Sequence, residues 1–112
     1  MPDREPVEVT NLDIYGSPPL PWSRPHDHLA AGPPSADIPF FLGTARPDGR
    51  PHSAGIGALW MDGDIYVVAG PGTRKARNLG GNPASTISVR LADIDLILEG
   101  EATRVIMPSR RS

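Results

Sequence analysis

The sequence predicts a small, mainly β protein in which antiparallel strands form a barrel beside one short helix. Short runs of residues alternate between apolar and polar side chains, as strands with one buried face do. Most of these runs are joined by tight turns of glycine, proline and aspartate rather than by the long crossovers of a parallel sheet. The five expected strands span residues 40–46, 52–60, 64–69, 84–91 and 94–103.

Length and composition limit the class of protein further. With 112 residues, the chain has the size of one small domain. A formal net charge of −2 and a pI of about 5.8 give no sign of a nucleic-acid partner. The sequence has no cysteine, no apolar run long enough to span a membrane and no signal-peptide start. We therefore expect a cytoplasmic protein without disulfides, thiolate metal sites or a membrane partner.

Residues 1–38 are expected to form an extended, proline-rich arm outside the core. Nine of the 14 prolines precede Phe40. Between the prolines stand apolar anchors that suit a segment lying across a partner surface: Leu12, Ile14, Tyr15, Leu20 and Trp22. Residues 25–31 can form one or two helical turns. His26 and His28 lie there, but two imidazoles two residues apart on a helix point apart and no third ligand is near, so we expect a solvated turn without metal.

The second expected strand carries two glycines on one face. Alternation places His52, Ala54, Ile56, Ala58 and Trp60 on one face and Ser53, Gly55, Gly57 and Leu59 on the other. The two glycines would let a flat ligand or another backbone approach closely, and a bend in a small barrel is the alternative. Residues 61–64 indicate a tight hairpin to the next strand. In the last two strands, the inner face is expected to hold Ile87, Val89, Leu96 and Leu98.

A basic turn after the third expected strand is the strongest candidate for a binding site. Residues 70–72 (Gly-Pro-Gly) end the strand, Thr73 has the features of a helix N-cap, and Gly80 or Gly81 ends the short helix. Arg74 and Lys75 fall in the first helical turn, where the helix dipole disfavours each cation by about 0.3–1 kcal/mol. A bound anion would reverse that sign, and the free N–H groups, the hydroxyl and the cations favour a phosphate. A solvated basic turn is the alternative, since the pattern is not a Walker A motif.

Three of these segments resemble a known family. Residues 41–52 (FLGTARPDGRPH), 60–67 (WMDGDIYV) and 72–79 (GTRKARNL) are similar in sequence and order to the pyridoxamine 5′-phosphate oxidase-like, flavin-binding split-barrel superfamily. The branch that uses the deazaflavin cofactor F420 is the most similar, and the FMN branches share the basic turn. The resemblance runs from Phe40 to about Val105, and residues 98–102 and 20–24 also fit it.

The resemblance implies a fold and a set of cofactor-binding residues. It implies an antiparallel, Greek-key split β-barrel over residues 39–106, preceded by the arm and followed by a disordered tail, 107–112. Family chains continue through a further strand and helix, so the barrel here is expected to be incomplete. The residues that would hold the phosphate of F420 or FMN are Thr73, Arg74, Lys75, Arg77 and Asn78, and those whose backbone would lie along the ring are His52, Ser53 and Ala54.

The resemblance also implies an activity and a partner. Similar proteins are oxidoreductases that transfer a hydride between the cofactor ring and a small organic substrate, and most are homodimers with cofactor sites at the subunit interface. His52 and Tyr66 could act as a general acid, but both residue types more often pack or contact the ring, so no catalytic residue is assigned. The alternatives are a non-catalytic FMN- or F420-binding module and an incomplete barrel without ligand.

Overall fold

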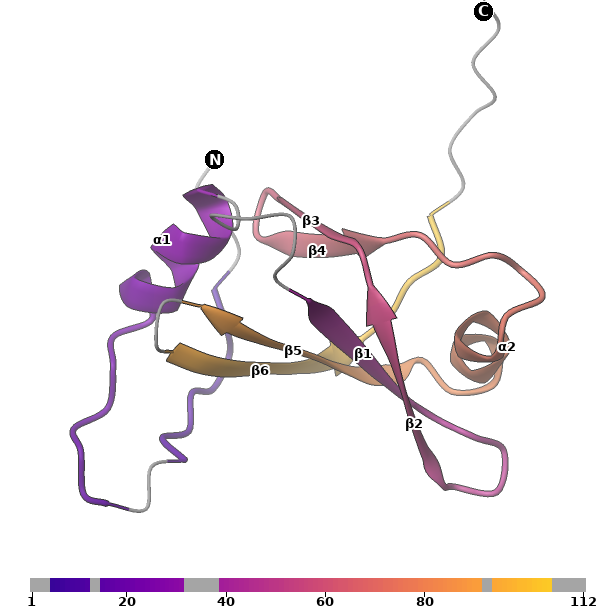
Figure 1. Ribbon diagram of the computed structural model, residues 1–112, viewed down its shortest axis with the longest axis horizontal. Helices are drawn as coiled ribbons and strands as arrows, with labels where there is room; N and C mark the ends of the chain where they lie inside the picture. Colours follow the sequence, from indigo (N-terminus) through magenta and orange to yellow (C-terminus); the bar gives the residue numbers. More distant parts are fainter. Residues whose placement is uncertain (1–4, 13–14, 32–38, 92–93, 106–112) are drawn as a thin grey trace, which may run out of the picture.

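The computed structural model describes residues 5–12, 15–31, 39–91 and 94–105 (Figure 1). The expected anchor Ile14, the turn at residues 92–93 and the tail at residues 107–112 lie outside the described residues. Two helices and six strands follow one another along the chain: α1 (Ser23–Ala31), β1 (Phe40–Ala45), β2 (Pro51–Ile56), β3 (Ala58–Met61), β4 (Asp64–Val67), α2 (Arg74–Gly81), β5 (Ala84–Leu91) and β6 (Ile94–Glu101).

The strands form two antiparallel sheets that do not close into a barrel within the described part of the chain. Four strands pair in the order β2-β1-β5-β6, and β3 and β4 form a separate hairpin. Within the larger sheet, β1–β2 and β5–β6 are hairpins of strands that follow one another in sequence. The two hairpins are joined by β1 and β5, which are far apart in sequence and place Leu42 opposite Ile87. The mainly β, antiparallel, incomplete split barrel expected from the sequence is therefore confirmed.

The strand expected over residues 52–60 is two strands, β2 and β3, which belong to different sheets. Gly57 separates them, and a residue without a side chain allows the chain to bend from one sheet into the other. The alternation of partly buried and exposed residues runs through the break, from His52 to Trp60, as the sequence predicts. The bend, which was the alternative explanation of the glycine face, accounts for Gly57.

The arm is not extended throughout, because α1 forms a second helix within it. Pro25 lies in the first turn of α1, where its missing N–H removes no helical hydrogen bond. Leu29 is 4% exposed and joins the hydrophobic core. The imidazole of His26 lies between two indoles, with ring centroids 6.1 Å from Trp22 and 5.8 Å from Trp60. The expectation of a solvated turn at His26 is therefore wrong, since ring contacts hold that side of α1 against β3.

The four-stranded sheet has one covered face and one open face. At one end of the covered face, α1 and the β3–β4 hairpin pack over Phe40 and Leu91. Val89 is 6% exposed, as predicted, and the other three expected inner residues are half-buried and pack against the same core: Ile87, Leu96 and Leu98. At the other end, α2 lies against β1 and β2 (Figure 1).

Local turns follow from their residues. Asp62 and Gly63 both have positive φ, 55° and 86°, as a two-residue hairpin of the I′ type requires, and the predicted β3–β4 turn is confirmed. Gly49 has φ 89° in the β1–β2 turn, where its N–H donates to the carbonyl of Arg46 at 2.8 Å. Neither of the two described helices is long and apolar enough to cross a membrane.

Candidate functional site

Thr73 begins α2 as a true N-cap, as predicted. Its backbone is extended, with φ −75° and ψ 156°, and its Oγ1 accepts a hydrogen bond from the Ala76 N–H at 3.3 Å. The same hydroxyl donates to the Gly70 carbonyl at 2.7 Å, and the Thr73 N–H donates to that carbonyl at 3.0 Å. Because the hydroxyl proton is already donated, an anion at this turn would be held mainly by backbone N–H groups and by cations.

The far end of α2 differs from the expectation in detail. Gly80 and Gly81 are both inside the helix, which is capped by Asn82 in an extended conformation. The Asn82 N–H donates to the Asn78 carbonyl at 2.9 Å. The glycines therefore do not act as left-handed terminators, and the helix ends because Asn82 leaves helical geometry just before Pro83.

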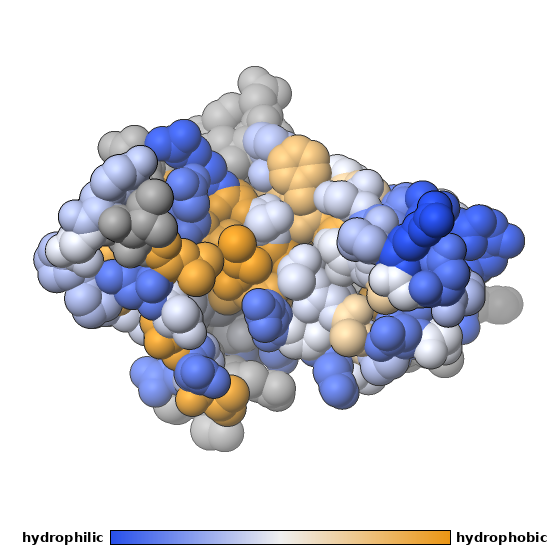
Figure 2. Space-filling model, turned by 90° about the horizontal axis from the view of Figure 1, so that it is seen from below, coloured by the Kyte–Doolittle hydropathy of each residue, from blue (hydrophilic) through white to orange (hydrophobic). Residues whose placement is uncertain are grey.

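The start of α2 is cationic. Arg74 and Arg77 are exposed and Lys75 is half-buried. The first turn contains no acidic residue, and no carboxylate among the described residues forms an ion pair with these three side chains. Figure 2 shows strongly hydrophilic residues gathered at the end of the molecule where both α2 and the β1–β2 turn lie. The three cations at the start of α2 are therefore without an ion-pair partner among the described residues.

Asn78 differs from the other residues predicted for the turn, because its side chain is 2% exposed and faces the sheet. Its Nδ2 donates to Oγ1 of Thr44, on β1, at 3.0 Å. Its Oδ1 is buried and has no hydrogen-bond partner within the described residues. Sequence patterns did not single out Thr44, whose only signal was a hydroxyl at an inward position of an apolar strand.

The predicted ring-contact residues lie on β2, close to this helix. His52 and Ala54 are half-buried and Ser53 is exposed. His52 is the register partner of Thr44, and its Nδ1 is buried without a hydrogen-bond partner in the described part of the chain. Because α2 packs against both β1 and β2, the fold brings the basic turn and the strand predicted to follow the ring into one region.

β2 is an edge strand of the four-stranded sheet, since β1 is its sole neighbour among the described strands. The backbone N–H and C=O groups along its other edge are therefore available to a ligand. On the open face, Gly55 and Gly43 pair with Phe41 and Ser53 respectively. A Cβ added to Gly43 would clash with Oγ1 of Thr86, so a larger residue there would require the Thr86 side chain to move.

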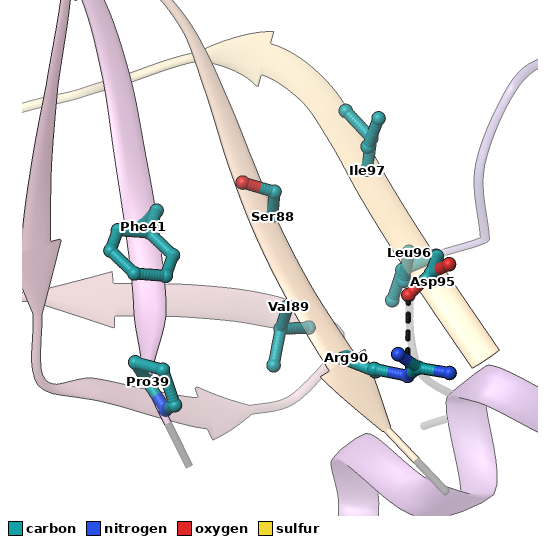
Figure 3. A pocket seen from close by; sticks show the side chains of 8 residues that line it. All are labelled: Pro39, Phe41, Ser88, Val89, Arg90, Asp95, Leu96 and Ile97. Carbon is teal, nitrogen blue, oxygen red and sulfur yellow. Dashed lines mark ion pairs between the residues drawn. The ribbon is translucent and has the colours of Figure 1, made fainter. Parts of the chain in front are cut away.

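An open pocket of about 340 Å³ lies on the same face, nearer to β5 and β6 (Figure 3). Phe41 and Ile97 stand at its sides and are 43% and 51% exposed. An ion pair between Arg90 and Asp95, 3.6 Å apart, lies at one end of it. None of the predicted cofactor-binding residues lines this pocket. In the sequence, this pocket is indicated by the outward position of Phe41 and Ile97 in the alternation of their strands.

Other candidates from the sequence do not form a site. Tyr66 lies on β4, in the separate hairpin, and is 37% exposed. The described residues contain no group of three side chains that could hold a metal ion. Nδ1 of His26 lies 3.2 Å from Oδ1 of the adjacent Asp27.

The two open antiparallel sheets define a mainly β protein of the split-barrel class, in which α2 begins with a cationic turn. A sequence model described as pyridoxamine 5′-phosphate oxidase matches residues 34–110. That match covers more than half of the chain, so the protein belongs to this family, and the resemblance inferred from the three motifs is confirmed.

A solved structure supports the same assignment. The chain is similar to a protein named F420 Reductase, with 30% sequence identity and a TM-score of 0.55. The likeness covers 60% of this chain and 56% of that protein's chain, so it extends over little more than half of each. No curated protein sequence matches the chain.

Proposed function

We propose that this protein binds F420 or FMN and acts as an oxidoreductase that transfers a hydride between the cofactor ring and a small organic substrate. The observation that carries the proposal is that three cations and the first N–H groups of a helix gather at the start of α2, and that none of these cations forms an ion pair with a described carboxylate. Both cofactors carry a phosphate group, which such a turn suits in charge and in hydrogen bonding. Membership of the family and the likeness to an F420 reductase support the same cofactors.

The residues of the turn fit a phosphate in distinct roles. Thr73 fixes the direction of the first turn by capping it, so that the free N–H groups point outward from the helix end. Lys75 is half-buried, whereas Arg74 and Arg77 are exposed, so a phosphate contact made by Lys75 would be the least screened by water. We expect Lys75 to contribute most to phosphate affinity, with the two arginines adding longer-range attraction.

The ring is proposed to lie along the free edge of β2. The polar edge of a flavin or deazaflavin ring has hydrogen-bond donors and acceptors, and an unpaired strand edge presents complementary backbone groups. Ser53 and Gly55 are exposed on the open face of β2, beside that edge, and both are small. When bound, the cofactor supplies the hydride chemistry, while the protein binds and orients it and excludes water.

We propose that the protein is a homodimer with its cofactor sites at the subunit interface, as the family resemblance implies. The open sheet face carries exposed apolar residues, including Phe41 and Ile97. The arm also carries exposed apolar residues, since Leu12 is 68% and Leu20 is 44% exposed within one chain. A second copy would cover such surface and would complete the site beside β2.

A second candidate function is cofactor binding without turnover. The open sheet of the single chain favours it, because a ring bound at the edge of β2 without a partner subunit over it would be exposed to water. The two candidates share the phosphate site and differ in whether bound reduced cofactor is oxidised by a substrate.

Comparing FMN with riboflavin tests the phosphate site directly, because the two ligands share one ring and differ by the phosphate. Binding is followed by the quenching of flavin fluorescence on titration with the protein. We expect the affinity for FMN to be at least about tenfold above that for riboflavin, as a charge-assisted contact requires. A parallel titration with F420 decides between the two cofactors. Equal binding of FMN and riboflavin, together with no binding of F420, would contradict the proposal. Oxidation of bound reduced cofactor by a panel of small unsaturated compounds then separates an enzyme from a binding module.

A further inference from the structure

The most deeply buried contact between α2 and the sheet is polar. The helix has eight residues, two of them glycine, and a helix of this length is not stable by itself in water. Its one fully buried residue is Asn78. The position where a short docked helix would normally bury an apolar side chain is thus occupied by an amide.

The partner of that amide is equally buried. Thr44 is 5% exposed and accepts the Asn78 Nδ2 hydrogen bond at 3.0 Å. Loss of this bond would leave two more buried polar groups, the Asn78 amide nitrogen and the Thr44 hydroxyl, without that partner, in addition to the Oδ1 that already lacks one among the described residues. Unpaired buried polar groups are unfavourable, so the bond restricts α2 to the orientation in which amide and hydroxyl meet.

This orientation bears on the basic turn. Asn78 follows Arg74 by four residues and Lys75 by three, so these three residues are neighbours on the helix surface, about one turn apart. A rotation of α2 about its axis that broke the Thr44 contact would turn both cations by the same angle. Thr44 in turn is the register partner of His52 on β2, the strand proposed to follow the ring.

We propose that Thr44 and Asn78 form a positioning pair that sets the direction of the phosphate-binding turn relative to β2, and that neither side chain contacts the cofactor. The inference rests on the proposed function and gives Asn78 a different role from the direct phosphate contact that its place in the motif suggests. Its buried amide, turned toward β1, is the observation that separates the two roles.

The test compares Thr44→Val, which removes the hydroxyl at nearly constant volume, with Thr44→Ser, which keeps it. For each full-length variant, the affinities for FMN and riboflavin are measured by titration. We expect Thr44→Val to weaken FMN binding about tenfold while riboflavin binding stays within about twofold of the parent. Thr44→Ser should retain the parental ratio. A role in general stability would lower both affinities together, so an unchanged ratio in Thr44→Val overturns the inference.

Two further measurements keep the inference falsifiable. Hydrogen exchange on the ligand-free variants should be faster in residues 76–81 of Thr44→Val and unchanged in β5 and β6, because only α2 loses its anchor. Parental exchange in α2 would contradict the proposal. In a double-mutant cycle, Asn78→Leu should weaken FMN binding much less in the Thr44→Val background than in the parent. Fully additive losses would indicate that Asn78 contacts the phosphate directly.

Failure of the proposed function can be distinguished from failure of the positioning pair. If the parent binds neither FMN nor F420, the proposed function fails, and the cofactor part of this inference fails with it. Faster exchange confined to α2 in Thr44→Val would then still support the pair as the anchor of the helix.

Discussion

Replacing Lys75 by alanine tests the phosphate site most sharply. The sequence contains this one lysine, and it lies half-buried in the first turn of α2. A hydrogen bond from a charged donor to a phosphate contributes about 1.5–3 kcal/mol, so the variant should bind FMN or F420 roughly tenfold to a hundredfold more weakly. The free energy of unfolding without ligand should not fall and could rise by about 0.3–1 kcal/mol, because a cation leaves the positive end of a helix.

The matched control is Arg24→Ala. Arg24 is exposed in the first turn of α1, which also contains no acidic residue, so its removal gives a similar relief of charge without touching the proposed site. Cofactor affinity is measured by fluorescence titration and unfolding by urea denaturation for both variants. Bound FMN should also protect the Lys75 amine from acetylation, read by mass spectrometry. Parental affinity of Lys75→Ala for both cofactors would refute the phosphate assignment.

Three other outcomes follow from the same structure. Thr73→Val should lower the free energy of unfolding by about 0.5–2 kcal/mol through loss of the cap, and should weaken FMN binding as well; a stability equal to the parent in urea would show that the cap bond does not matter. Leu42→Ala should cost about 2–5 kcal/mol because Leu42 is 2% exposed, and Leu96→Ala should cost less because Leu96 is half-buried; the reverse order in denaturation would mean that the inner face is wrongly assigned. Deletion of residues 1–20, which leaves α1 intact, should weaken the proposed dimer, and light scattering that finds the same mass before and after deletion would exclude the arm from the interface.

Features governed by local chemistry could be predicted from the sequence. The N-cap at Thr73 and the turn at Asp62 and Gly63 depend on a few adjacent residues, and the structure has both where the sequence indicates them. The inner faces of β5 and β6 could also be predicted from the sequence, because alternation fixes which side chains share a face once one of them is known to be buried.

Features that depend on tertiary contact could not be predicted in the same way. A glycine such as Gly57 is compatible with a bend or a close approach, and only the pairing of its neighbours decides between them. The helical part of the arm is stabilised by the burial of Leu29 and by the contacts of His26 with two tryptophans, one of them distant in sequence. For Asn78, the motif suggested a ligand contact, whereas its partner Thr44 lies 34 residues away.

The strand order β2-β1-β5-β6 has a consequence for how the chain folds. Three hairpins can form from local sequence, but the described four-stranded sheet is complete only when β1 meets β5, after the chain has passed from Ala45 to Ala84 through β2, β3, β4 and α2. Closing that long loop costs conformational entropy before any β1–β5 contact repays it, so this step should limit the folding rate. Substitutions where the two hairpins meet, such as at Leu42, should then slow folding. If α2 docks on the finished sheet, changes in α2 should mainly speed unfolding. Stopped-flow refolding of the two kinds of variant would distinguish this order of events from one in which α2 docks first.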